Sequence, residues 1–340
     1  MKIVKAGYEV IKGLPLTKKI ERIARVCYKS EERICDGSDI KMINILIERK
    51  HLAMLEHGSL AFIVDKYTYK YVKDVISYLE SSCINNNPQI NKPKRYYLQF
   101  TKHADFERGT RRYIISGNMR AWFEFLNNSF DCYELPQELC EAAIGLSNGI
   151  LNTFIGKLNY LDLNNSYVKF ITDFSELSTE ERMVHENISV LFTVDRGVAN
   201  ELVRHREASF AQESTRYCSY SLGRFGNEIT VIEPYFWTSK DMIAEYTIWK
   251  HICESAECAY LNLLGLGATP QRARDVLPIS IKTDIVVTAN LREWYHILNL
   301  RACDATGPAH PQIREVMIPL LRELQNNEYS FAFNDLQIPN

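Results

Sequence analysis

Apolar residues recur along the chain with two different spacings, and these spacings predict helices and strands. Between residues 16 and 28 the apolar side chains stand three or four positions apart, at Ile20, Ile23 and Ala24, as on one face of a helix. Residues 59–65 are instead a short run rich in apolar, β-branched and aromatic side chains, which is typical of a strand. By the same criteria we expect strands over residues 2–5, 111–116, 188–194, 228–232 and 276–288, helices over residues 40–52, 118–127, 139–158, 242–264, 271–275, 290–301 and 311–323, and a polar loop over residues 81–96.

Three permanently or potentially cationic side chains stand in a row at Arg204-His205-Arg206, which follows an apolar segment. Residues 197–203 carry apolar pairs four positions apart, which predicts an amphipathic helix. On a regular helix Arg204 and Arg206 would point about 200° apart, so they would serve two anionic ligands or one long ligand at the helix end. Guanidinium groups suit such ligands because they make forked hydrogen bonds to phosphate. A solvated basic face at a helix C-terminus is the alternative interpretation.

A polar loop rich in hydrogen-bonding side chains is expected after this motif, and a second charged group lies further on. The loop contains Ser209, Gln212, Glu213, Ser214 and Thr215. The second group comprises Asn290, Arg292, His296 and Arg301, on or just after one predicted helix whose first-turn N–H groups favour anions. Arg301 follows an apolar face, so we expect its guanidinium to be partly buried and to need an anionic partner. A surface arginine with a snorkelling stem is the alternative for each arginine.

Composition narrows the class of protein. The chain has 340 residues, enough for one large or two ordinary domains, and is 24% charged and 46% hydrophobic. Its net charge of −2 gives no global field that would favour nucleic acid. The nine cysteines include no C-x-x-C pair, which argues against a disulfide framework or a zinc site. No signal-peptide core or membrane-spanning apolar run is present, so we expect a cytoplasmic protein without a metal or a membrane partner.

Two pairs of segments resemble each other and suggest an internal duplication. Residues 59–65 are similar to residues 189–195, and residues 118–122 to residues 290–294. At the positions of Arg204, His205, Arg206 and Arg301 in the later copy, the earlier copy has Asp74, Val75, Ile76 and Ser129. Only the later copy would then have kept a charged site. The two offsets differ, 130 residues (59 to 189) against 172 (118 to 290), so chance similarity between apolar strands is an equal alternative.

With both charged groups considered, the chain resembles the flavin-dependent thymidylate synthases. The signature of that family is Arg-His-Arg, seven residues and then Ser, found here as residues 204–206 and Ser214 and continued by Arg216 and Tyr217. Further matches are Leu55-Glu56-His57, Val276-Leu277-Pro278 and Asn290-Leu291-Arg292 with Arg301. The matches extend over residues 20–65 and 185–325.

The resemblance implies an α+β fold with an antiparallel or mixed central sheet flanked by helices. It implies a catalytic core made of residues 1–65 and 185–330, with residues 66–184 as an inserted segment or a degenerate copy of the core. It also implies an enzyme that reductively methylates dUMP to dTMP with methylenetetrahydrofolate and NADPH as co-substrates and FAD as hydride carrier. A homotetramer with FAD at its subunit interfaces is implied as well.

The resemblance also assigns residues by position. The flavin-binding positions are Ala53, Arg204, His205, Arg206, Gln212, Asn290, Arg292 and His296, and Ala53 stands where many members have Ser or Thr. The dUMP-binding positions are Glu201, Leu202, Val203, Arg204, Gln212, Glu213, Ser214, Thr215, Arg216, Arg274 and Arg301. Arg301 is the catalytic residue, expected to stabilise negative charge on the uracil ring, because a guanidinium with a pKa above about 12 is a poor base. The resemblance implies a reaction without a protein nucleophile, and no His–Asp pair is evident that would activate Ser214 as one.

Two alternatives belong to other classes. A nucleic-acid-binding protein could stack bases on Tyr217, Tyr220 and Phe225, but no wider basic stripe accompanies them. A relative of the synthases that has lost catalysis could use its extra segment for regulation. Flavin absorbance of the purified protein separates the first alternative from the synthase, and dUMP-dependent activity separates the second.

Overall fold

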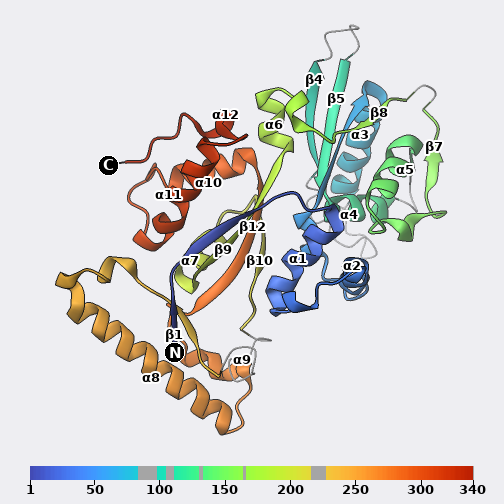
Figure 1. Ribbon diagram of the computed structural model, residues 1–340. Coiled ribbons are helices and arrows are strands. Elements are labelled where there is room, and N and C mark those ends of the chain that lie inside the picture. The colour runs from blue at the N-terminus through green and yellow to red at the C-terminus, as the bar shows by residue number, and fades with distance from the viewer. Residues whose placement is uncertain (83–97, 105–110, 130–132, 164–165, 216–226, 340) are drawn as a thin grey trace. The chain divides into compact units, whose positions relative to one another are not determined.

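The computed structural model describes residues 1–340 except 83–97, 105–110, 130–132, 164–165, 216–226 and 340. It divides into two compact units (Figure 1). Unit 1 consists of Met1–Lys12, Arg22–Arg33 and Ile188–Asn340, and unit 2 of Gly13–Glu21 and Ile34–Asn187. Each unit contains a four-stranded sheet and several helices, which confirms the α+β prediction. Within the described ranges, no helix is both long enough and apolar enough to span a membrane.

The sheet of unit 1 has the order β10-β12-β9-β2. Its strands are β2 (Gly7–Ile11), β9 (Asn187–Asp195), β10 (Ser209–Gln212) and β12 (Lys282–Asn290), with β2 antiparallel to β9 and β10 antiparallel to β12. The helices are α7 (Arg196–Leu202), α8 (Ile243–Gly265), α9 (Pro270–Ala273), α10 (Leu291–Arg301), α11 (Pro311–Gln325) and α12 (Ser330–Phe333). A second, two-stranded sheet pairs β1 (Lys2–Val4) in parallel with β11 (Thr230–Ile232).

Helix α10 is fixed at its start and along its buried face. Asn290 caps it, because its Oδ1 accepts a hydrogen bond from the Glu293 N–H at 2.9 Å. Trp294, Ile297 and Leu298 recur at helical spacing and are 0% exposed. The Trp294 indole donates to the carbonyl of Ile188 at 3.0 Å, which ties the helix to β9. The capped end and the apolar stripe together bring the end of α10 to the sheet.

Unit 2 has an antiparallel sheet with the order β4-β5-β3-β8. Its strands are β3 (Ser59–Asp65), β4 (Gln99–Ala104), β5 (Arg111–Asn118) and β8 (Val168–Phe170), and β6 (Glu134–Pro136) pairs in parallel with β7 (Asn159–Leu161). The helices are α2 (Ser38–Glu48), α3 (Lys66–Ser82), α4 (Met119–Ser129), α5 (Gln137–Leu146) and α6 (Thr179–His185), and α1 (Leu16–Tyr28) has residues in both units. Short 3-10 turns are η1 (Glu31–Arg33), η2 (Leu52–His57), η4 (Asn152–Phe154), η5 (Phe174–Glu176), η7 (Tyr235–Trp237), η8 (Lys240–Met242) and η9 (Arg274–Val276).

The same local plan occurs in both units. In each, one strand ends in an aspartate that caps the next helix, Asp65 before α3 and Asp195 before α7. In each, the neighbouring strand ends in an asparagine that caps a helix, Asn118 before α4 and Asn290 before α10. The strand orders β4-β5-β3 and β10-β12-β9 correspond.

Several predicted boundaries are wrong for identifiable reasons. The helix predicted over 139–158 ends at Leu146, because Asn148 (φ 51°) and Gly149 (φ 97°) turn into the left-handed region. The strand predicted over 276–288 begins only at Lys282, after the turn η9. The first part of the polar loop expected from Ser209 to Thr215 is the strand β10, since Ser209–Gln212 pairs with β12. The loop expected over 81–96 lies outside the described residues except at the end of α3.

Candidate active site

The Arg-His-Arg motif lies just after helix α7, not on it. The helix ends at Leu202, and the N–H groups of Arg204 and His205 donate to the carbonyls of Glu201 and Leu202 at 3.3 and 3.1 Å. The helical separation expected for Arg204 and Arg206 therefore does not apply. Both arginine side chains are exposed, whereas the His205 between them is buried. One motif thus supplies two solvent-facing cations and one buried imidazole.

Arg301, at the last position of α10, meets the motif in a group that we call the guanidinium cluster: Glu201, His205 and Arg301. Its Nη1 donates to Glu201 Oε2 at 2.8 Å, and its Nε donates to His205 Nε2 at 3.3 Å. The Arg301 side chain is 21% exposed and that of Glu201 is 28% exposed. The expectation that Arg301 is partly buried and has an anionic partner is confirmed. Residues 100 positions apart are joined here, by the packing of α7 and α10 against one sheet.

His205 is neutral in this cluster. Burial, together with the positive charges of Arg301 and His296, lowers its pKa to about 4. Because Nε2 accepts from Arg301, the ring proton is on Nδ1, which lies 3.9 Å from Glu293 Oε1. Burial raises the pKa of that Glu293 carboxyl. The imidazole therefore acts as a neutral acceptor that orients the guanidinium, and Arg301 stays charged.

The segment after the motif carries the next predicted site residues. Gln212 Nε2 donates to Thr283 Oγ1 at 3.4 Å, and the Ser214 N–H donates to the carbonyl of Cys27 at 3.1 Å. Arg274 Nη1 donates to Thr215 Oγ1 at 3.4 Å, so two predicted nucleotide contacts from distant parts of the chain lie together. Hydroxyl groups and a guanidinium in contact suit a phosphate ester.

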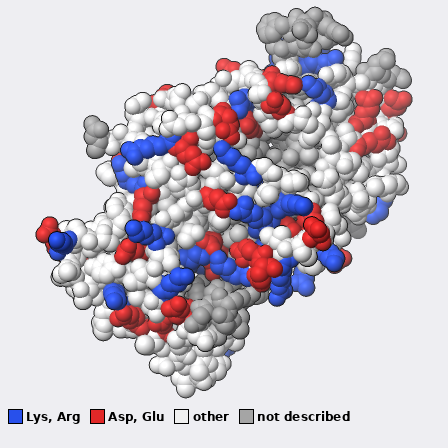
Figure 2. All heavy atoms as spheres, in the orientation of Figure 1, with Lys and Arg blue, Asp and Glu red and all other residues white. Residues whose placement is uncertain are grey.

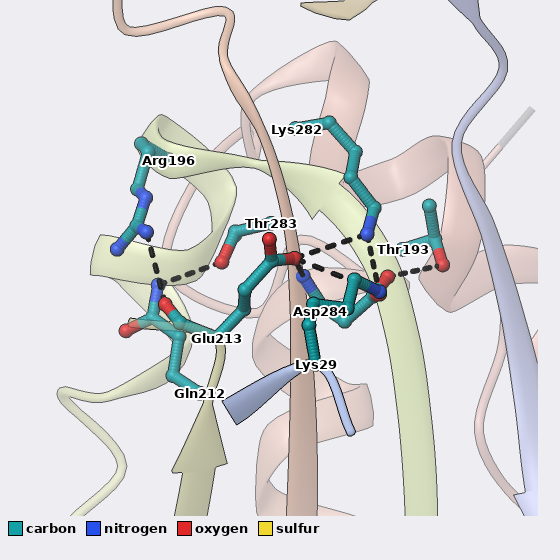
Figure 3. Close-up of polar contacts among 8 residues, drawn as sticks. All are labelled: Lys29, Thr193, Arg196, Gln212, Glu213, Lys282, Thr283 and Asp284. Carbon is teal, nitrogen blue, oxygen red and sulfur yellow. Dashed lines mark hydrogen bonds and ion pairs between the residues drawn. The ribbon is translucent and has the colours of Figure 1, made fainter. Parts of the chain in front are cut away.

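Glu213 belongs to a buried set of four charged side chains that we call the charge network: Lys29, Glu213, Lys282 and Asp284 (Figure 3). Lys282 Nζ lies 3.1 Å and Lys29 Nζ 3.8 Å from Glu213 Oε2, and both ammonium groups also pair with Asp284. The Glu213 side chain is only 2% exposed. The Asp284 N–H donates to Glu213 Oε2 at 3.3 Å, and the Glu213 N–H donates to the Asp284 carbonyl at 2.8 Å.

Electrostatics explains why this network can be buried. Burial raises the pKa of the Asp284 carboxyl, but the charges of Lys282 and Lys29 outweigh burial and hold the pKa below its usual value. Burial likewise lowers the pKa of Lys29, and Glu213 and Asp284 together raise it. Thr193 donates a further hydrogen bond to Asp284 at 2.8 Å. Two cations and two anions neutralise each other. The network therefore fixes the Glu213 side chain, and with it the backbone between Gln212 and Ser214.

The other predicted site residues lie as follows. Asn290 caps α10, and Arg292 and His296 are exposed on that helix, with the His296 ring centroid 6.0 Å from that of His205. Leu202 is buried in the core, and Val203 is 42% exposed. Arg216 lies outside the described residues. Ala53 is an exposed residue of η2 in unit 2.

Sequence reasoning missed the lysines and Asp284 of the charge network. The signal for two of them was present, because Lys282 and Asp284 stand two positions apart at the start of a strand with an apolar middle and so face the same side of the sheet. Lys29 gave no such signal. On the face that Figure 2 shows, basic and acidic side chains are interspersed among the described residues.

Comparison with known proteins identifies the family. Residues 135–327, more than half of the chain, match the family described as thymidylate synthase complementing protein (Thy1). The chain belongs to this family. The Thy1 match begins within residues 66–184, the segment that the resemblance treats as an insertion.

Individual Thy1 relatives align over shorter stretches. A flavin-dependent thymidylate synthase from Thermococcus kodakarensis is 34% identical over 146 residues, which is 42% of this chain and 57% of that protein. One from Mycobacterium sp. (strain KMS) is 31% identical over 181 residues, 47% of this chain and 66% of that protein. The chain thus spans 57% to 66% of the length of these two relatives.

A solved structure is also similar in part. The UMP/dUMP methylase PolB from Streptomyces cacaoi, bound with 5-Br dUMP, is 24% identical, with 44% of this chain and 70% of that chain covered and a TM-score of 0.37. A likeness at that TM-score carries no argument about this chain.

Proposed function

We propose that this chain is a flavin-dependent thymidylate synthase, which methylates dUMP to dTMP with FAD, methylenetetrahydrofolate and NADPH. The observation that carries the proposal is the guanidinium cluster, which a Thy1 chain forms from the Arg-His-Arg motif and the distant Arg301. The catalytic residues of the core would then all lie within residues 185–330.

Arg301 has the geometry for charge stabilisation. Its Nη1 and Nε are held by Glu201 and His205, and its Nη2 has no protein partner within the described part of the chain. We assign this free group to a carbonyl oxygen of uracil, where it stabilises the negative charge that develops as C5 becomes nucleophilic. A preorganised donor of this kind contributes about 2.7–4 kcal/mol to transition-state stabilisation. Arg274 and Thr215, with Gln212 and Ser214 beside them, would bind the phosphate and sugar of dUMP.

The residues present fit an anionic dinucleotide cofactor. Arg204, Arg206 and Arg292 are exposed, and none of them has an ion-pair partner among the described residues. Three unpaired guanidinium groups suit the pyrophosphate of FAD, and His296 and Asn290 add polar contacts from the same helix. When bound, FAD supplies the hydride, taken from NADPH, that converts the transferred one-carbon unit into a methyl group. Ala53 offers only a methyl group to such a cofactor.

The decisive assay is dUMP-dependent oxidation of NADPH by the purified chain with FAD and methylenetetrahydrofolate, with dTMP measured as product. We expect dTMP to form in proportion to the NADPH oxidised. A yellow, flavin-loaded protein without dUMP-dependent turnover would contradict the proposal and identify an inactive relative. A homotetramer, which the family resemblance supports, predicts a light-scattering mass of four chains.

We also infer that unit 2 is a degenerate copy of the core in unit 1. The shared strand order, the paired Asp and Asn caps and the buried Trp122 and Trp294 support this inference. The unequal offsets have a structural cause, because β4 and β5 are separated by residues 105–110 while β10 and β12 are separated by a segment that contains α8 and α9.

The positions of unit 2 that correspond to Arg204, His205, Arg206 and Arg301 carry none of these basic residues. Val75 and Ile76 are buried in α3, which continues past the position where α7 ends. Ser129, at the position of Arg301, donates instead to the carbonyl of Phe125 at 2.7 Å. We therefore expect one dUMP per chain by calorimetric titration. Two dUMP molecules per chain would contradict the inference.

A further inference from the structure

Unit 2 contains a polar cavity of about 180 Å³ at the end of its sheet away from α4. Alternation along β3 and β5 divides the sheet into two faces. Phe62 faces Trp122 of α4, with ring centroids 5.5 Å apart, while Ile63 and Ile114 form a cluster with Leu177 beside η5. The cavity lies on this second face, and the residues that concern its chemistry are Ile63, His103, Arg112, Tyr167, Lys169 and Glu176.

Arg112 is the group that the surrounding protein leaves unmatched. Its guanidinium carbon lies 3.7 Å from the centroid of the Tyr167 ring, a cation–π contact that fixes the side chain. Its Nε is buried, and among the described residues Arg112 has neither a hydrogen-bond partner for this Nε nor an ion pair. A partly buried guanidinium without an anion carries a desolvation cost. The cavity therefore contains an unsatisfied cation.

The lysine and the imidazole at the cavity each contact a carboxylate. Lys169 Nζ lies 2.9 Å from Glu176 Oε2. His103 Nδ1 lies 2.6 Å from Glu181 Oε1, and although burial raises the pKa of that carboxyl, its hydrogen bonds with His103 and Ser178 lower it below its usual value.

Asp65 stands opposite Arg112 in the strand register, but its carboxylate binds backbone N–H groups and does not pair with Arg112. Its oxygens accept hydrogen bonds from the N–H groups of Tyr67, Thr68 and Tyr167. The Arg112 guanidinium thus forms no ion pair with a described carboxylate and can pair with an anionic ligand.

We propose that this cavity binds a small oxyanion, a carboxylate or phosphate group, through Arg112, with Lys169 and His103 at its sides. A guanidinium presents a fork of donors that matches either group. A volume of about 180 Å³ corresponds to roughly six waters at about 30 Å³ each. It admits a phosphate group or a short carboxylate, and it is smaller than the roughly 300–1,000 Å³ that drug-sized ligands occupy.

The equivalent position in unit 1 supports this assignment. Arg112 stands six residues before the cap Asn118, and Asp284 stands six residues before the cap Asn290. At that position in unit 1 the charge is balanced within the protein, since Asp284 pairs with two lysines of the charge network. Unit 2 has the opposite charge there and an open cavity in place of a second set of ions. The inference does not depend on the proposed synthase activity.

The test is calorimetric titration of the full chain with inorganic phosphate and, separately, with acetate, at constant ionic strength. Saturable binding is expected for at least one anion, and the arm that binds identifies the source as phosphate-like or carboxylate-like. Because Arg274 in unit 1 is proposed above to bind the phosphate of dUMP, Arg274→Gln is titrated as well and should keep the unit 2 isotherm.

Arg112→Gln should weaken this binding by at least about tenfold, the loss expected for a charge-assisted contact, while Lys157→Gln, an exposed lysine of the same unit, should not. Lys169→Gln, half exposed, should weaken it several-fold and serves if Arg112→Gln fails to fold. No saturable binding of either anion, or isotherms unchanged in Arg112→Gln or Lys169→Gln, would overturn the proposal.

Discussion

Replacing Lys282 by methionine removes one of the two ammonium groups of the charge network and keeps the apolar stem. In the native chain Lys282 is 14% exposed, and its Nζ contacts Glu213, at 3.1 Å, and Asp284. After the substitution these two carboxylates, 2% and 10% exposed, share Lys29 alone. A buried set that was neutral acquires a net charge of −1.

The size of the expected loss in the free energy of unfolding follows from the burial of these charges. Breaking a buried ion pair by removing one partner costs about 3–5 kcal/mol, because the remaining charge is uncompensated. Lys29 stays in contact with both carboxylates and offsets part of this cost, so we expect a loss of about 2–3 kcal/mol in the free energy of unfolding. Lys250→Met is the matched control. Lys250 forms an exposed pair with Glu254 at 3.9 Å, and such pairs contribute about 0.3–0.5 kcal/mol.

Urea unfolding followed by tryptophan fluorescence provides the measurement. Three of the four tryptophans, at positions 237, 249 and 294, are in unit 1, so the signal reports mainly on the unit that contains Lys282. A lower midpoint at an unchanged slope would show a loss of stability. Adding Asp284→Asn to Lys282→Met restores neutrality and should cost at least about 1 kcal/mol less than the two single losses combined. If Lys282→Met unfolds at the same urea concentration as Lys250→Met, the network does not stabilise unit 1 and this argument is wrong.

The remaining predictions concern the site and its protonation. Arg301→Ala should lower kcat/KM for dTMP formation by at least about 10²–10³ while FAD stays bound, and turnover at the native rate would contradict its role. Arg206→Ala should release the yellow cofactor on gel filtration, and full retention of FAD would show that another cation holds it. The pKa of His205 is lowered to about 4, so its neutral form stabilises the folded state above pH 6.5, and this stabilisation is lost as pH falls from 6.5 toward 4. The His205→Gln variant should therefore lose less stability than the native chain between pH 6.5 and 4. Equal losses would contradict the assignment of a neutral His205. The lowered pKa of Asp284 means that its ionised carboxylate stabilises the folded state above the unfolded pKa, and that this stabilisation is lost as pH falls through the folded pKa. Asp284→Asn should therefore make the free energy of unfolding depend less on pH below about pH 4.

Local sequence determined the elements whose patterns are strong. The helix predicted over residues 290–301 is present as α10, because its buried stripe is encoded locally, although Asn290 caps the helix and does not lie within it. Pro270 likewise begins a short helix as expected, since proline fits the first helical position. The expectation that Arg301 needs an anionic partner also came from sequence, because an arginine after an apolar face cannot stay fully solvated. Patterns of this kind depend on neighbours within two helical turns.

Only the tertiary structure decided which strands and which charged side chains are partners. Ser209–Gln212 looked like a polar loop, but its pairing with β12, some seventy residues later, makes it a strand. That Glu201 is the partner of Arg301, and that His205 is neutral, follow from two helices that pack on one sheet. Lys29 joins Lys282 in the charge network although most of the chain separates them. Burial of a charge selects its partner by distance in space, which the order of residues along the chain does not specify.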